Sequence, residues 1–233
     1  MDNDWGYVAE SKKTRFVALV MATHFPQALT MLVVTTVASA AYGQQGIKLF
    51  FVAIATAAGQ ASIGWANDYI DAKSDLALNR NHKPSVKYSL DPKTLRTPIL
   101  VAIVVMVPFS FLAAGWVGGL AHILAVASAQ VYNLYLSRTI WSWLPYAVSF
   151  ALLTVFITQS SWGELWPSWQ IVSIAACVGI IAHVFNALPD IQIDKEVKLG
   201  GLVVSLGKSR AVALIVLLAA ILLGLLAEVV SYV

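Results

Sequence analysis

The chain has 233 residues, of which 59% are hydrophobic and only 12% are charged. Soluble domains are closer to half apolar and a quarter charged, so this composition excludes an ordinary soluble domain and indicates an integral membrane protein. The net charge of +3 does not indicate nucleic-acid binding, because the basic residues lie in loops between apolar segments rather than in one patch.

Along the chain, seven apolar segments approach the roughly 20 residues that a helix needs to cross the hydrocarbon core. None shows the alternation typical of a barrel strand. The sequence therefore predicts an all-α integral membrane protein, a bundle of about seven transmembrane helices that forms one domain over residues 1–233. The predicted spans are 17–41, 47–66, 97–115, 117–136, 140–160, 169–188 and 210–232.

The basic residues divide unequally between the two ends of these spans. Fourteen of the 15 lysines and arginines fall in the N-terminal tail or in the regions that follow the second, fourth and sixth spans. Lys48 alone falls on the opposite side. By the positive-inside rule, the N-terminus and these basic loops are expected to be cytoplasmic in a multi-pass protein of the cell membrane.

Two acidic clusters stand where predicted spans reach the basic side. The first lies in NDYIDAKSD after the second span, and the second lies in NALPDIQID after the sixth. Both contain the pattern N-x-x-x-D-x-x-x-D, which indicates a duplicated helical unit. Because offsets of three, four and seven share one helix face, each cluster is expected to form a stripe. Pro189 is expected to interrupt the second stripe, since proline cannot continue the helical hydrogen bonds.

The chemistry of the clusters indicates a site for a metal ion and a phosphate compound. An ionised aspartate at mid-bilayer costs about 2.5–3.5 kcal/mol, so five of them are expected at a membrane surface facing a wet cavity. Converging carboxylates repel one another unless cations hold them, and hard oxygen ligands suit Mg²⁺. The neighbouring bases Arg80, Lys83 and Lys195 suit a metal-bridged polyphosphate.

At these residues the chain resembles the UbiA superfamily of intramembrane prenyltransferases, whose two motifs are NDxxDxxxD and DxxxD. They stand here as NDYIDAKSD and DIQID, and the resemblance extends from THFPQ through NRNHKP and VYNLYLSRTIWSWLP to SLGKSRA. It implies Mg²⁺-dependent transfer of an isoprenyl group from a prenyl diphosphate to an aromatic or other small acceptor within the membrane, among the membrane lipids.

The resemblance also implies roles for individual residues. Mg²⁺ would be bound by Asn67, Asp68, Asp71, Asp75, Asp190 and Asp194. The diphosphate would be bound by Asn67, Arg80, Lys83, Asn186 and Lys195. Catalytic roles would fall to Asp71, Asp190, Tyr132 and Arg138, where Arg138 replaces the family's usual lysine and Tyr135 is an alternative to Tyr132. His183 shares the second stripe and is a further candidate for positioning a substrate.

The number of predicted spans differs from the family fold, which usually has nine transmembrane helices. Seven spans imply that the last two are missing and that the cavity opens sideways into the bilayer.

Other functions remain open at this point. A terpene cyclase of the same superfamily would use the same acids, and a non-catalytic membrane scaffold is a third possibility. A metal or ion carrier fits less well, because carrier sites lie near the midplane rather than at one end of the spans. The acceptor, the length of the donor and the oligomeric state are not determined.

Overall fold

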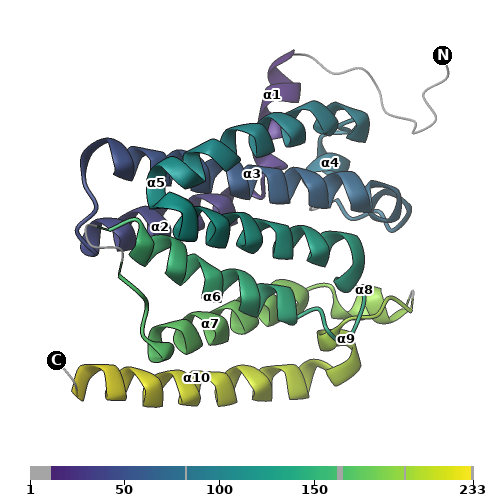
Figure 1. Cartoon of the computed structure of the whole chain (residues 1–233). Helices are drawn as coiled ribbons and strands as arrows, with labels where there is room; N and C mark the ends of the chain where they lie inside the picture. Colours follow the sequence, from purple (N-terminus) through teal and green to yellow (C-terminus); the bar gives the residue numbers. More distant parts are fainter. Residues whose placement is uncertain (1–11, 82, 162–164, 197, 232–233) are drawn as a thin grey trace. The chain divides into compact units, whose positions relative to one another are not determined.

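The computed structural model describes residues 12–81, 83–161, 165–196 and 198–231, and every regular element in these ranges is helical (Figure 1). This confirms the predicted all-α class. The chain divides into two compact units, residues 1–115 and 116–233, and each unit is described by itself. The first acidic cluster belongs to the first unit and the second cluster to the second unit.

The first unit is built around a helical hairpin. Its elements are α1 (Lys12–Met21), α2 (Phe25–Ala41), α3 (Gly46–Ala77), α4 (Pro84–Lys87), the 3₁₀ helix η1 (Pro92–Leu95) and the first part of α5 (Arg96–Val131). α2 and α3 are joined by a short connection and pack against each other as antiparallel neighbours. α3 is the longest uninterrupted helix of this unit, and it carries all three acids of the first cluster.

The bend between α1 and α2 is held against α3 by close backbone packing. A Cβ atom at Gly64 would collide with the backbone of Thr23, so only glycine permits this approach. Next to it, the indole Nε1 of Trp65 donates a hydrogen bond of 2.8 Å to the carbonyl of Leu19. These contacts fix the position of the bend, and with it His24, beside the acidic end of α3.

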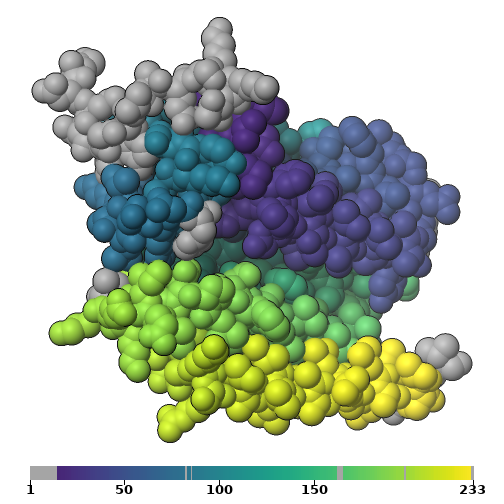
Figure 2. Space-filling view, turned by 180° about the vertical axis from the view of Figure 1, so that it is seen from behind, coloured from purple at the N-terminus to yellow at the C-terminus, as the bar shows by residue number. Residues whose placement is uncertain are grey.

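The second unit contains a second hairpin of the same kind. Its elements are the remainder of α5, the π-helix η2 (Tyr132–Leu136), α6 (Leu144–Gln159), α7 (Trp169–Ala187), α8 (Ile191–Glu196), α9 (Leu202–Leu206) and α10 (Lys208–Ser231). α6 packs on α7, where Gly179 permits close approach of the Tyr146 backbone. α10 packs on α7 and α9 and leaves the apolar side chains of Val216 and Leu223 exposed; Figure 2 shows this helix in yellow.

Each predicted span lies on a helix, but the helix boundaries differ from the prediction. The first span is divided by a 55° bend into α1 and α2. The second continues past residue 66 to Ala77, so the acids extend the spanning helix instead of following it. The spans 97–115 and 117–136 lie on one stretch of helix, α5 followed by η2, which is broken at non-helical Ala114 and Gly115, whose φ is 62°.

Helix length and composition give fewer membrane-crossing helices than the seven predicted spans. Within the described ranges, four helices are long and apolar enough to cross a membrane, or five if the bent pair α1–α2 counts as one span. α6 is apolar but shorter. The α5 stretch counts once in this total although it is broken at Gly115. The predicted count of about seven is therefore not established by helix length.

Candidate active site

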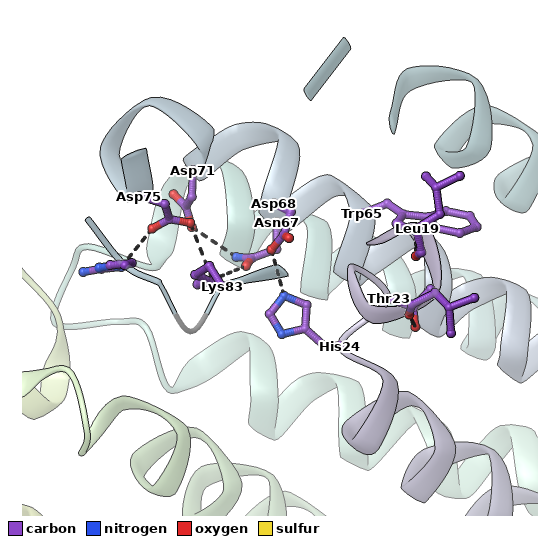
Figure 3. Close-up of polar contacts among 11 residues, drawn as sticks. Leu19, Thr23, His24, Trp65, Asn67, Asp68, Asp71, Asp75 and Lys83 are labelled. Atoms are coloured by element: carbon purple, nitrogen blue, oxygen red, sulfur yellow. Dashed lines mark hydrogen bonds and ion pairs between the residues drawn. The ribbon is translucent and has the colours of Figure 1, made fainter. Parts of the chain in front are cut away.

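The first acidic cluster lies along one side of the last turns of α3 (Figure 3). The helix passes through Asp68, Asp71 and Asp75 without a break and ends at Ala77. The chain then reverses at Asn79, whose φ of 50° is left-handed, and returns beneath the acids. This turn brings the predicted bases to the predicted acids. Asp68 and Asp75 are fully buried, which requires partners for their carboxylates.

Two cations from the returning chain supply part of this compensation. The Lys83 ammonium donates a hydrogen bond of 2.8 Å to Oδ1 of Asn67 and lies 3.9 Å from Oδ2 of Asp75. Arg80 donates a bond of 3.2 Å to Oδ1 of Asp75. The Asn67 amide in turn donates to Asp71 at 3.2 Å. Five residues that the sequence assigned to metal and diphosphate binding therefore form one connected network (Figure 3).

His24 is a member of this cluster that the sequence did not reveal. Its Nε2 atom lies 3.1 Å from Oδ1 of Asp68, and its backbone is left-handed with φ 56° at the start of α2. Pro26 in the first turn of α2 marks the beginning of that helix and so locates the bend. The contact itself joins residues 44 positions apart, and no local pattern predicts it.

The second acidic cluster is built on a broken helix. α7 ends at Ala187, a turn contains Pro189 and Asp190, and α8 begins at Ile191. The expected interruption at Pro189 is thus confirmed. Asp190 and Asp194 are each partly exposed, and they are linked by a backbone bond of 2.9 Å from the Asp194 amide to the Asp190 carbonyl. The predicted diphosphate ligands Asn186 and Lys195 are exposed.

A buried serine holds the loop that follows the second cluster. The Ser142 hydroxyl lies 2.9 Å from Nε2 of His183 and accepts a hydrogen bond of 3.1 Å from the Leu202 amide. Gly200 packs so closely on the Arg138 carbonyl that a side chain there would collide with it. The segment after Asp194 is therefore fastened to the turn between η2 and α6. Sequence reasoning singled out Arg138 and His183 but missed Ser142.

Aromatic rings surround His183 on α7. The Tyr132 ring lies edge-on to His183 with centroids 5.8 Å apart, and the Tyr146 ring lies at 5.0 Å. Tyr135, the alternative to Tyr132, is 72% exposed. Of the two tyrosines, the arrangement favours Tyr132 as the one that belongs to the polar end of the second unit.

Within each unit, the described residues of the acidic cluster offer oxygen ligands of the kind that Mg²⁺ prefers but no complete set of protein ligands. Among the described residues, no three histidine, cysteine, aspartate or glutamate side chains converge on one point as a ready-made metal site. The donors are hard oxygens, as Mg²⁺ prefers, and Oδ2 of Asp75 is buried without a hydrogen bond. Mg²⁺ is commonly bound through one or two carboxylates, with water and substrate phosphate completing its shell. The donor set is compatible with that mode.

Apolar helices with acids and bases at one end define a membrane protein with a polar, charge-compensated site. The family model described as the UbiA prenyltransferase family matches residues 28–233, and the chain belongs to that family. This confirms the resemblance drawn from the two motifs. It also supports the assignment as an integral membrane protein, together with the apolar helices.

Solved structures with the same fold come from Archaeoglobus fulgidus. A UbiA homolog bound to GPP and Mg²⁺ has a TM-score of 0.78 at 18% identity, over 93% of this chain and 78% of that chain. The same homolog bound to DMAPP and Mg²⁺ has a TM-score of 0.77 at 18% identity, over 94% and 78%. No curated protein matches this chain.

Proposed function

We propose that this protein is a membrane prenyltransferase that uses Mg²⁺ and transfers an isoprenyl group from a prenyl diphosphate to a small aromatic acceptor. The observation that carries the proposal is the network of Asn67, Asp71, Asp75, Arg80 and Lys83 at the end of α3. In this network, carboxylate and amide oxygens that can bind Mg²⁺ lie beside cationic side chains that can bind phosphate. Family membership and the solved relatives bound to GPP or DMAPP with Mg²⁺ support the same chemistry.

The proposed division of labour follows from the side chains. Mg²⁺ would be held by Asn67, Asp68, Asp71, Asp75, Asp190 and Asp194, and it would neutralise charge on the diphosphate. Arg80 and Lys83 compensate the carboxylates in the structure described and would bind the diphosphate when it is present. Lys195, Asn186 and Arg138 would supply further contacts from the second unit.

Departure of the diphosphate leaves an allylic cation that must be kept from water. Negative charge grows on the leaving group as the carbon–oxygen bond breaks, and fixed cations such as Lys83 stabilise it. The face of an aromatic ring attracts a cation, which gives Tyr132 its proposed role. The apolar helices would keep water from the cation until the acceptor attacks. The acceptor would then lose its proton to the carboxylate of Asp71 or Asp190.

Product analysis tests the proposal. The full chain in lipid nanodiscs would be incubated with Mg²⁺, prenyl diphosphates of several lengths and a panel of aromatic acceptors. Mass spectrometry should find a prenylated acceptor, with one diphosphate released for each product and none in the presence of EDTA. A cyclised donor formed without any acceptor would favour the terpene cyclase instead. Absence of diphosphate release from every donor would exclude both enzymes and favour a scaffold.

We also propose that the N-terminus and both acidic clusters face the cytoplasm. The support is the distribution of basic residues, with Lys48 alone at the opposite end of the spans. In a Cys177-free chain in sealed cells, an impermeant thiol reagent should label a cysteine that replaces Lys48 and not one that replaces Lys87. The opposite labelling pattern would show an inverted protein.

A further inference from the structure

A basic hollow lies on the first unit, on the flank of α3 that faces away from the acids. It encloses about 220 Å³ and is lined by Tyr69, Ile70, Lys73, Pro92, Lys93 and Arg96. At 100° per residue, Tyr69 and Lys73 fall nearly opposite the face shared by Asp71 and Asp75. The hollow is therefore separate from the acidic network described above, and the proposed function does not use it.

The hollow is strongly positive. Three of its six lining residues are cations and none is acidic. Asp91 lies two residues before Lys93, and its carboxylate is occupied as the cap of η1, where Oδ1 accepts a hydrogen bond of 2.9 Å from the Lys93 amide. Tyr69 holds the Arg96 guanidinium in place. The Nε atom of Arg96 donates a hydrogen bond of 2.9 Å to the Tyr69 hydroxyl, and the Cζ atom of Arg96 lies 5.3 Å from the centroid of the Tyr69 ring. That hydrogen bond uses one of the five N–H donors of the Arg96 guanidinium.

An exposed apolar stripe continues from the hollow along α5. Leu100 and Val104 follow Arg96 at intervals of four residues, so they lie on the same side of the helix. They are 62% and 63% exposed, and neighbouring Val101 is 55% exposed. In a membrane-spanning helix, such a face contacts lipid chains. The hollow thus lies at the polar end of a lipid-facing surface, where basic pockets on membrane proteins bind lipid headgroups.

We propose that this hollow binds the phosphate headgroup of an anionic phospholipid, with the acyl chains lying along Leu100 and Val104. Lys93 and Arg96 supply charge from the start of α5, and Lys73 supplies it from α3. The continuity of cationic hollow and apolar stripe favours an amphiphile over a free phosphate, which would gain nothing from the stripe. The positive-inside rule would explain Lys93 and Arg96 by membrane topology alone.

Lipid binding to the full chain tests the site independently of any enzyme activity. Native mass spectrometry in detergent would compare phosphatidylglycerol with phosphatidylcholine of the same chains. The wild type should prefer phosphatidylglycerol, and each charge removed should weaken that lipid about fivefold. Lys93→Gln tests one charge while leaving the Tyr69–Arg96 contact intact, and the double variant Lys93→Gln/Arg96→Gln tests two. Lys87→Gln, an exposed lysine outside the hollow, is the matched control and should bind like the wild type.

Three results would overturn the site. Equal binding of the two lipids by the wild type would remove the headgroup preference. A loss of preference in Lys87→Gln as large as in Lys93→Gln would show that only the overall charge matters. Displacement of phosphatidylglycerol by inorganic phosphate at matching concentration would show a site for free anions. Failure of the proposed prenyl transfer would leave all three comparisons unchanged.

Discussion

The two acidic clusters share one sequence pattern but are held in different ways. In the first unit, α3 continues through all three acids; Asp75 is buried beside Arg80 and Lys83, and Asp68 is buried beside His24. In the second unit, the helix breaks before Asp190, and both acids are partly exposed. There the fastening comes from Ser142 and Gly200, which fix the chain on either side of the cluster.

The difference shows that one motif can be positioned by two physical strategies. Buried carboxylates must be compensated where they stand, so the first cluster depends on Lys83, Arg80 and His24. Partly exposed carboxylates keep some of their hydration, so the second cluster depends less on buried compensating cations, and Ser142 and Gly200 fasten its backbone. Substitutions of the buried acids and bases in the first cluster should therefore affect folding and activity together, whereas substitutions of the exposed side chains in the second cluster should affect activity with little change in stability.

The largest expected effect tests what the clusters have in common. Asp71→Ala and Asp190→Ala each remove a proposed metal ligand and should lower diphosphate release by about 100-fold or more, since fixed charge stabilisation of this kind is worth that much. Release would be measured with GPP and saturating Mg²⁺. Asp91→Asn, which lies outside both clusters and keeps a capping oxygen, should remain active. Normal turnover by either alanine variant would mean that one cluster suffices.

The next prediction separates the clusters by stability. Lys83→Met leaves buried Asp75 with fewer compensating charges and should lower the free energy of unfolding by about 2 kcal/mol, as for other broken buried ion pairs. Lys195→Met alters an exposed side chain and should change it by less than about 0.5 kcal/mol. Denaturation in mild detergent, followed by tryptophan fluorescence, gives both values. Equal destabilisation by the two variants would contradict the contrast between the clusters.

A smaller effect is expected at the fastening of the second cluster. Ser142→Ala removes the hydrogen-bond partner of His183 and of the Leu202 amide, which should cost about 1.5 kcal/mol of stability. Because the loop after Asp194 is loosened, the Mg²⁺ concentration for half-maximal activity should rise. Ser149→Ala removes a hydroxyl of α6 that bonds the Ala125 carbonyl and should leave that concentration unchanged. A shared rise would indicate general loosening of the unit.

Much of this architecture could be predicted from the sequence because it depends on local rules. Apolar length located the helices, the three-four-seven spacing placed the acids on one side of α3, and Pro189 marked the break before α8. The end of the second span was predicted too early, because hydropathy falls at Asn67 while the helix continues. Charged residues along one face do not interrupt a helix.

The contacts that fasten the two clusters could not be predicted. His183 and Ser142 are 41 residues apart, and Ser142 and Leu202 are 60 residues apart. Such pairs depend on how closely two helices approach. Gly64 and Gly179 allow close approach, but a glycine in the sequence does not indicate which helix will pack against it. The bend before α2 lies inside the single span predicted for residues 17–41, because apolar length alone takes no account of Pro26 at the start of α2.

The smallest expected effect concerns His24, which belongs to the first cluster through its contact with Asp68. His24→Asn keeps a residue that tolerates the left-handed backbone but shortens the side chain, so the contact with Asp68 is lost. One hydrogen bond to a charged group is worth about 1.5 kcal/mol, so the KM for GPP should rise roughly tenfold with kcat little changed. A double-mutant cycle with Asp68→Asn measures the coupling between the two residues. If His24 acts by holding the Asp68 carboxylate, the second substitution should add little to the first. Strictly additive effects would show that His24 works independently of Asp68 and does not belong to the first cluster.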